Sequence, residues 1–412
     1  MRAVTPSGLS AEAFRLVVIL SHPVQYFSPL FAEMARRSNM EIEVWYGHRG
    51  AVTGMHDEQF GTKIHWGTEL LEGYRYRFFN NASLRPRLGT HFWGVFNPGL
   101  VLALYRHRPD AVLIPGWAYA SYPLAWITAL VLRIPVFLRS DNPWSQEQRK
   151  SGPIQALKRW VLRLIAFPSV SRFLAVGKEN ADWYRSLGVP ECRILPAPHA
   201  VDAKHFSLSD TERAAARKAV RDRYEIPDDV CLFLFVGKLI EKKRPMDVIQ
   251  ASTGLSGFHL LFVGEGALKP ALARAAQEVE GHILFAGFVD QQILPSYFSA
   301  ADVLVLPSGM GETWGLVVNE AMASGLAVLV SDLCGCAPDL VHDGVNGYRF
   351  PCGDVPALRE RMRWFIDHRG SARGLGDASK RIIEEFSLTA AAEGFERAAR
   401  ESDRHYASSV RE

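Results

Sequence analysis

Residues 302–344 read DVLVLPSGMGETWGLVVNEAMASGLAVLVSDLCGCAPDLVHDG and contain the pattern that decides the fold. The apolar run DVLVLPS (302–308) predicts a buried strand that ends near Pro307. A glycine-bearing loop follows, and an apolar helix begins near Gly315 before the next apolar run, LAVLVSD (326–332). Two strands that are buried on both faces and joined by a helix indicate a parallel sheet with crossover helices.

The same alternation of short apolar runs and helical segments extends along the whole chain. The runs are RLVVILS (15–21), IEVWYG (42–47), AVLIP (111–115), PVFLR (135–139), RFLAVG (172–177), CRILPA (192–197), CLFLFVG (231–237), HLLFVG (259–264), HILFAGF (282–288), DVLVLPS (302–308) and LAVLVSD (326–332). They are too many for one doubly wound sheet. We therefore predict an α/β protein with two parallel sheets in tandem.

With 412 residues, the chain is long enough for two domains of about 200 residues each. The predicted boundary lies between Pro196 and Pro227, around a charged helical stretch. We expect an N-terminal domain over residues 1–205 and a C-terminal domain over residues 206–385. Residues 386–412 read as a long amphipathic helix, which we expect to pack back toward the N-terminal domain.

The composition, with 48% hydrophobic and 22% charged residues, is that of a globular protein and excludes a disordered chain, a collagen and a coiled coil. The formal charge of +3 is a sum over unlike halves. Residues 1–205 carry 24 Lys and Arg against 15 Asp and Glu, or +9, so the remaining residues carry −6. This asymmetry suggests an anionic partner of the first half, such as a membrane surface or nucleic acid.

The five cysteines are few, odd in number and far apart, which argues against a disulfide framework and for a reducing cytoplasm. Cys334 and Cys336 lack the spacing of a zinc site, and no metal site is predicted. The apolar run at residues 16–20 is too short for the core of a signal peptide.

Two segments raise the question of a membrane. Residues 111–132 are uncharged and long enough to cross a bilayer, but Pro115 and Pro123 interrupt them, so a strand followed by a buried helix is favoured. Residues 150–168, KSGPIQALKRWVLRLIAFP, alternate bases with apolar residues as an interfacial helix does. A buried helix with a charged outer face is an equal alternative. The bases of this segment are Lys150, Lys158, Arg159 and Arg163.

Two carboxylates flank the predicted helix start at Gly315. Free backbone N–H groups at such a start form an anion site suited to a phosphate or a diphosphate. Glu312 precedes the helix and Glu320 lies about a turn and a half into it. Both are suited to accepting hydrogen bonds from sugar hydroxyls beside that anion. The alternative is an acid that stabilises the helix dipole and a solvated helix acid.

Two further segments follow strands of the second half. Lys238 and Lys243 come after CLFLFVG, where two cations could clamp a diphosphate, although solvated loop lysines are an alternative. Gly264 and Gly266 form a Gly-x-Gly turn, but Lys269 stands where a dinucleotide fingerprint needs a third glycine. That substitution disfavours an NAD-dependent dehydrogenase.

Taken in order, these motifs resemble the C-terminal domain of family-4 glycosyltransferases of the GT-B fold (glycosyl transferases group 1), in which two Rossmann-like domains face each other across a cleft. The resemblance rests on FVGKL with Lys243, VGEG, ILFAGFVD, the E-x7-E pattern of ETWGLVVNE, AMASGLAVLVSD and LVHDGVNGYRF. It is strong over residues 170–350 and loose over the N-terminal third.

The resemblance implies roles for the donor-side residues. The C-terminal domain would bind a nucleotide-diphosphate sugar, with Lys238 and Lys243 on the phosphates, Glu312 on the sugar hydroxyls and Glu320 on the ribose. The remaining implied donor contacts are the amides of Gly315, Leu316 and Val317, the turn at Gly264, and the nucleobase pocket around Gly287 and Phe288.

The N-terminal half departs from the family pattern. Where many members carry a Gly-Gly turn after the first strand, this chain has SHPVQYFSPL (21–30), which looks like a subset of bacterial surface-polysaccharide glycosyltransferases. His22, Gln25 and Tyr26 form a polar rim for a sugar or a phosphate, unless His22 only caps the helix. Further acceptor-side candidates are Trp117, Tyr119, Arg139, Ser140 and Asp141. The base that takes the acceptor proton is open, and Asp141 is our candidate.

The implied activity is a retaining, metal-independent transfer from a UDP- or GDP-linked sugar to a hydroxyl of a glycan or lipid-linked acceptor. No cofactor and no nucleic-acid partner are expected, and the protein would be cytoplasmic or peripheral on the inner face of the plasma membrane. Alternatives are a nucleotide-sugar epimerase of GT-B fold and a non-catalytic subunit that binds the sugar nucleotide.

Overall fold

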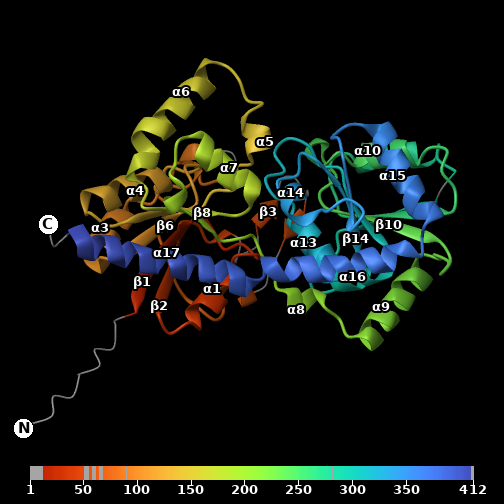
Figure 1. Ribbon diagram of the computed structural model, residues 1–412, viewed down its shortest axis with the longest axis horizontal. Coiled ribbons are helices and arrows are strands. Elements are labelled where there is room, and N and C mark those ends of the chain that lie inside the picture. Colours follow the sequence, from red (N-terminus) through yellow and green to blue (C-terminus); the bar gives the residue numbers. More distant parts are fainter. Residues whose placement is uncertain are drawn as a thin grey trace, which may run out of the picture.

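The computed structural model describes residues 13–50, 55–57, 62–64, 68–89, 91–280 and 282–409. The described chain forms two lobes, each built around one parallel sheet with helices on both faces (Figure 1). The prediction of an α/β protein with two parallel sheets in tandem is therefore confirmed.

The first lobe holds a seven-stranded parallel sheet. Its strands, in spatial order, are β5 (Arg75–Phe78), β2 (Met40–Tyr46), β1 (Phe14–Leu20), β6 (Ala111–Ile114), β7 (Val136–Leu138), β8 (Arg172–Ala175) and β9 (Ile194–Pro196). Its helices are α1 (Ser28–Ala35), α3 (Gly99–His107), α4 (Ser121–Val131), α5 (Trp144–Glu147), α6 (Pro153–Val161) and α7 (Lys178–Ser186). A short antiparallel hairpin joins β3 (Met55–Asp57) to β4 (Thr62–Ile64).

The second lobe holds a six-stranded parallel sheet. Its strands, in spatial order, are β12 (His282–Gly287), β11 (Phe258–Val263), β10 (Cys231–Val236), β13 (Val303–Leu306), β14 (Ala327–Ser331) and β15 (Gly347–Phe350). Its helices are α8 (Ala203–Phe206), α9 (Asp210–Arg223), α10 (Pro245–Ser252), α11 (Lys269–Ala276), α12 (Leu294–Ala300), α13 (Leu316–Ala323), α14 (Ala337–Leu340), α15 (Val355–Asp367) and α16 (Ser371–Ile383).

All eleven apolar runs form strands, because a central parallel strand is covered by helices on both faces and must be apolar throughout. In β10, alternate residues such as Leu232 and Phe233 enter separate cores on the two faces of the sheet. Besides the short strands β3 and β4, two strands of the main sheets escape the sequence pattern, β5 (RYRF) and β15 (GYRF). Both lie at sheet edges, where one side of the strand has no neighbour and polar residues are tolerated.

Residues 111–132 form strand β6, a short turn and helix α4, as predicted. Of the helices in the described residues, none combines the length and the apolar character that a membrane crossing needs.

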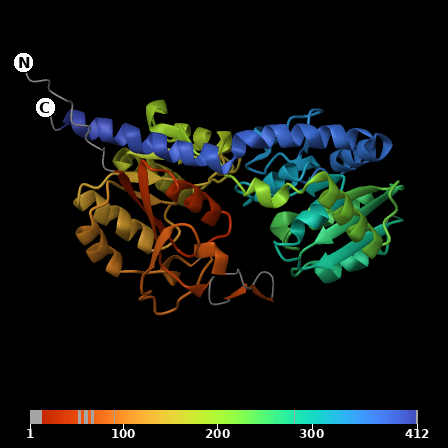
Figure 2. The same ribbon diagram turned by 90° about the horizontal axis from the view of Figure 1, so that it is seen from below.

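The last helix, α17 (Leu388–Ser409), returns to the first lobe and packs against α1, β8 and β9. It runs along the side of that lobe, and α16 lies on the same side of the second lobe (Figures 1 and 2). Its buried stripe is Ala391, Ala392, Phe395, Ala398 and Ala399. A Cβ atom on Gly394 would lie 2.2 Å from the carbonyl oxygen of Pro196, so the helix approaches as closely as it does only with glycine there.

We expect Phe395→Ala to lower the free energy of unfolding by about 3–5 kcal/mol, because it leaves a cavity between α17 and the first sheet. Chemical denaturation measures this change. Arg397→Ala, on the exposed face of the same helix, is the matched control and should cost under about 0.5 kcal/mol. Equal losses in the two variants would mean that α17 does not pack through this stripe.

Candidate functional site

Both sheets reverse their strand order at one point, between β1 and β6 in the first lobe and between β10 and β13 in the second. In open parallel sheets, the loops at the carboxyl ends of these strands form the ligand crevice. In the second lobe these are the loop after β10, with Lys238 to Lys243, and the loop after β13, with Ser308 to Gly315. Lys238, Lys243 and Glu312 therefore lie on adjacent loops.

At the centre of this region, the buried carboxylate of Glu312 pairs with the ammonium group of Lys243. Lys242 lies beside the same loop, since a Cβ atom on Gly311 would be 3.3 Å from Lys242 Cδ. Burial by itself would raise the pKa of Glu312. The charges of Lys243 and Lys242, with hydrogen bonds from Lys243 and Ser308, outweigh that effect and lower it. Glu312 is therefore ionised at neutral pH.

Helix α13 begins directly after this loop. Gly315 precedes it with φ +101°, in the left-handed region that favours glycine, and a Cβ atom there would meet Leu306 Cδ2 at 3.0 Å. Leu316 and Val317 form the first turn of the helix, where backbone N–H groups have no intrahelical acceptor. These amides and the lysines after β10 make the region favourable for an anion.

Glu320 lies on the same helix and accepts a hydrogen bond from Gln291 Nε2 at 3.2 Å. Burial raises the pKa of Glu320 to about 7, although the Gln291 hydrogen bond and the charge of Lys243 oppose the shift. The two carboxylates of the E-x7-E pattern thus differ, because Glu312 has a lysine partner and Glu320 has a neutral amide.

The glycine turns that follow β10, β11 and β12 are joined to one another by backbone contacts. The backbone of Gly237 donates to Val263, and a Cβ atom on Gly264 would lie only 2.0 Å from the Gly237 carbonyl oxygen. Gly264 in turn donates to Gly287, after which Phe288 is 44% exposed. Gly264 is thus required for close packing of backbone, whatever its part in ligand binding.

In the first lobe, His22, Gln25 and Tyr26 follow β1 at the point where the strand order reverses. Burial, with a smaller effect of the neighbouring His48, lowers the pKa of His22 to about 4, so its ring is neutral at pH 7. Burial and the charge of Asp141 raise the pKa of Tyr26 to about 12. The rim is therefore a set of neutral hydrogen-bonding groups.

The acceptor-side candidates after β7 have partners within the protein. Asp141 Oδ2 accepts a hydrogen bond from Thr313 Oγ1 of the second lobe at 2.7 Å. Arg139 is buried and donates to the carbonyl of Ala197 at 3.1 Å. Ser140 Oγ lies 3.0 Å from the hydroxyl of Tyr184. Asp141 is thus at the contact between the lobes, whereas Arg139 and Ser140 lie within the first lobe.

Trp117 and Tyr119 lie on the loop after β6. Trp117 packs 6.0 Å from Trp183, and Lys158 lies over its ring at 5.4 Å. The hydroxyl of Tyr119 accepts a hydrogen bond from Gly89 at 2.8 Å. Both aromatic rings therefore have structural contacts in the first lobe, and an acceptor role for Trp117 stays a prediction.

Sequence reasoning missed two residues beside Glu312. Lys242 was not predicted as a site residue because the family pattern contains only the lysine at position 243. The two lysines are neighbours in one turn. Gln146 comes from α5 of the first lobe, is buried, and donates to the carbonyl of Glu312 at 3.0 Å. No motif surrounds Gln146, and its partners are more than 160 positions away, so the sequence offers no signal for it.

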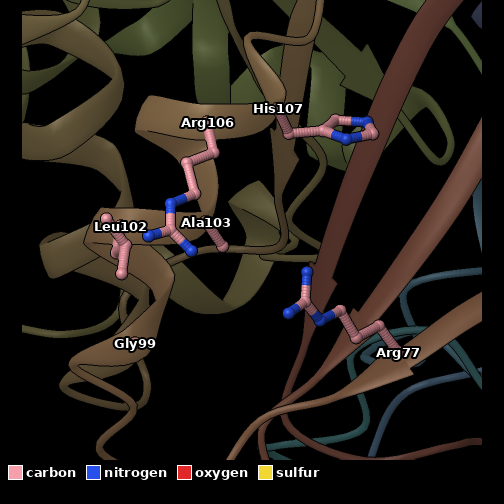
Figure 3. Close-up of a pocket in the computed structure, with 6 residues that line it drawn as sticks. All are labelled: Arg77, Gly99, Leu102, Ala103, Arg106 and His107. Carbon is pink, nitrogen blue, oxygen red and sulfur yellow. The ribbon is translucent and has the colours of Figure 1, made fainter.

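A surface pocket of about 250 Å³ lies away from these residues, between β5 and α3 (Figure 3). It is lined by Arg77, Gly99, Leu102, Ala103, Arg106 and His107. The side chain of His107 is engaged by Glu43 at 3.5 Å. None of the predicted site residues lines this pocket.

Two Rossmann-like parallel-sheet domains, each with polar or charged loops at the carboxyl ends of its strands, define an α/β protein of the GT-B fold. The model of the family "glycosyl transferases group 1" matches residues 216–382. A D-inositol 3-phosphate glycosyltransferase of Streptomyces avermitilis is 32% identical over 320 residues, which are 72% of this chain and 67% of that protein. The chain belongs to the glycosyl transferases group 1 family.

Other relatives match over shorter stretches. An alpha-D-kanosaminyltransferase of Streptomyces kanamyceticus is 25% identical over 263 residues, which are 61% of this chain and 65% of that enzyme. Three further curated relatives are matched over 42–60% of their own length. Among solved structures, Anabaena HepE in complex with UDP has a TM-score of 0.71 at 16% identity and is covered over 98% of its chain and 93% of this one. That likeness supports the fold.

The raised pKa of Glu320 makes a prediction about stability. Since the native value, about 7, exceeds the ordinary 4.5, the native state holds this proton more tightly than the unfolded chain. The stabilisation is complete below about pH 4.5 and is lost as the pH rises to about 7. We therefore expect wild-type protein to lose stability relative to Glu320→Gln across this interval and to level off above it.

Denaturant titrations at several pH values measure the difference in the free energy of unfolding between wild type and Glu320→Gln. The contributions of groups that titrate alike in both proteins cancel in this difference. A difference curve that does not change between about pH 4.5 and 7 would contradict the burial of Glu320.

Proposed function

We propose that this protein is a glycosyltransferase that moves a sugar from a UDP- or GDP-linked donor to a hydroxyl group of a glycan or lipid-linked acceptor. The proposal is carried by the ion pair of Glu312 with Lys243 in the loop before α13, where Lys242 lies beside the same loop. Two lysines around one carboxylate leave a positive balance where a diphosphate needs it. Membership of the family supports the same reaction class.

In this proposal the domain of residues 206–385 binds the donor. Lys238, Lys243 and the N-terminal amides of α13 neutralise the diphosphate, and Glu320 accepts hydrogen bonds from the ribose. Gly264, Gly287 and Phe288 lie on the nucleobase side. Glu312 faces the sugar and accepts hydrogen bonds from its hydroxyls, as a carboxylate kept ionised by Lys243 can.

The chemical step needs only these groups and the two substrates. The bond between C1 of the sugar and the diphosphate breaks, and the leaving group takes the electron pair beside the lysines and the helix amides. The acceptor hydroxyl attacks C1 from the same face, and Asp141 takes its proton. Retention of configuration, independence of a metal and the family-4 assignment rest on the resemblance of the motifs.

In this proposal the domain of residues 1–205 binds the acceptor. The C-terminal segment 386–412 packs back against that domain. His22, Gln25 and Tyr26 present neutral hydrogen-bonding groups at the switch point of the first sheet, which suits sugar hydroxyls. The SHPVQYF segment resembles that of bacterial surface-polysaccharide enzymes, so we place the reaction in polysaccharide or glycolipid biosynthesis.

We further propose that the first lobe rests on an anionic membrane that carries the acceptor. Apolar side chains are exposed on α3, α4 and the segment 153–166 of the first lobe. Figure 1 shows α3 and α4 at the outer end of this lobe and α6 standing out from it. The exposed apolar side chains are Val101, Leu102, Tyr105, Ile127, Leu130, Val131, Ile154, Leu157, Trp160, Val161, Leu164 and Ile165. Of the predicted bases, Lys150 and Lys158 pair with Glu147, so apolar contact carries more of the proposal than charge does.

The first test is a panel of UDP- and GDP-linked sugars, with nucleotide release followed by mass spectrometry. We expect release with at least one donor and a loss of about 100-fold or more in Glu312→Gln, since the carboxylate that meets the sugar is gone while the size is kept. Glu278→Gln, at an exposed residue in the turn after α11, is the control and should keep full turnover.

Full turnover by Glu312→Gln would overturn the assignment of Glu312. If an epimerised sugar nucleotide is released without any acceptor, the function is epimerisation and not transfer. Donor binding with no turnover in wild-type protein, whatever the acceptor, would mark a binding subunit.

The second test is flotation with vesicles that contain phosphatidylglycerol. We expect wild-type protein to float and the double variant Leu157→Asp/Trp160→Asp to lose about tenfold or more of its binding, because each exposed side chain gains about 1.5–3 kcal/mol on burial. Val345→Asp, at an exposed apolar site of the second lobe, should float like wild type. Unchanged vesicle binding by the double variant would contradict the proposal that this surface contacts the membrane.

A further inference from the structure

Gln146 joins the first lobe to the loop that holds Glu312. Its Nε2 donates to the carbonyl oxygen of Glu312 at 3.0 Å and to that of Leu333 at 2.7 Å, while its Oε1 accepts from the N–H of Gly311 at 2.8 Å. The side chain is 2% exposed, so these bonds form out of water. Both hydrogens and the oxygen of one amide are therefore used on the second lobe.

The first lobe holds Gln146 firmly in place. It lies in the short helix α5, whose last residue, Glu147, is buried and accepts hydrogen bonds from Asn142 at 3.0 Å and from Lys150 at 2.6 Å. Arg159 of α6 donates to the backbone carbonyl of Glu147. The amide of Gln146 is thus presented from a fixed support.

The loop on the other side contains two glycines, and within it the N–H of Glu312 donates to the carbonyl of Gly309 at 3.1 Å. Gly309 and Gly311 flank Met310, and Gly311 has φ +92°, a conformation that glycine adopts without strain. Gln146 bonds the N–H of Gly311 and the carbonyl of Glu312, and these two groups flank the Cα atom from which the Glu312 side chain departs. Together with the N–H of Gly335, which donates to the same Glu312 carbonyl at 3.2 Å, Gln146 holds this stretch of backbone, from which the carboxylate reaches Lys243.

We propose that Gln146 is a positioning residue of the reaction, which aims the Glu312 carboxylate and does so only while the two domains are in contact. The inference rests on the proposed function for its kinetic test. If Gln146 has this role, the donor site is complete only when the acceptor domain contacts it. The carboxylate that faces the sugar is then aligned by a residue of the acceptor domain.

The test variant is Gln146→Met, which keeps the size of the side chain and removes all three hydrogen bonds. We expect kcat for sugar transfer to fall about 10- to 100-fold, since small misplacement of a reacting group costs that much, while KM for the donor changes less than about threefold. The ribose and base contacts assigned to Glu320, Gly287 and Phe288 do not depend on Gln146. Gln146→Glu, which keeps the shape and the bond from Gly311, is the second variant and should also lose kcat at pH 8.

The matched control is Asp339→Ala. Asp339 accepts a hydrogen bond from the N–H of Lys178 at 2.9 Å and so also joins the lobes, but it does not contact residues 309–312. It should keep kcat within about twofold. A loss of kcat in Asp339→Ala as large as in Gln146→Met, or an unchanged kcat in both Gln146 variants, would overturn the proposal.

A second readout does not depend on turnover. Hydrogen exchange of the amides in residues 309–314 should speed up about tenfold or more in Gln146→Met and stay as in wild type in Asp339→Ala. Unchanged exchange would show that Gln146 does not hold the loop. Wild-type protein that is inactive with every donor would reject the proposed function instead, and the exchange result would still decide whether Gln146 fixes the loop.

Discussion

The parallel pairing of β10 with β13 is the constraint on which the site depends. Phe233 pairs with Val303 and Leu234 with Leu304, so two segments 70 positions apart in the chain end at the same edge of the sheet. The lysines after β10 and the carboxylate after β13 meet because of this pairing. A parallel pair cannot be closed by a tight turn, and the crossover through β11 and β12 supplies the connection.

Once the loops meet, the buried charge of Glu312 needs compensation. A carboxylate removed from water and left unpaired would take up a proton, and it would then accept fewer hydrogen bonds from a ligand. Lys243 and Lys242 prevent this. Glu320, eight positions later and inside α13, feels Lys243 less than the effect of burial and keeps its proton to about pH 7. One motif thus contains two acids of different character, and the difference comes from the loop after β10.

The sequence predicts most of the fold because central parallel strands are apolar on both faces, which makes each run visible by itself. The edge strands β5 and β15 lack that mark and are missed. At the site, residues that follow strands could be predicted from their place in the motifs, as for Lys243 and Glu312. Gln146 could not, because its importance comes from contacts between lobes that no local pattern encodes.

The charge asymmetry of the chain shows why net charge is a poor guide to a site. At physiological ionic strength, exposed charges are screened over about 8 Å, so the −6 of the second half is felt weakly at the start of α13. Lys243 contacts Glu312 and the charge of Lys242 also acts on it, so these two lysines have more effect there than the distant charges. In the first half, Lys150 and Lys158 neutralise the buried Glu147 and thereby anchor α5. Two of the positive charges of the first half therefore stabilise the position of Glu147. Its neighbour Gln146 bonds the loop that holds Glu312.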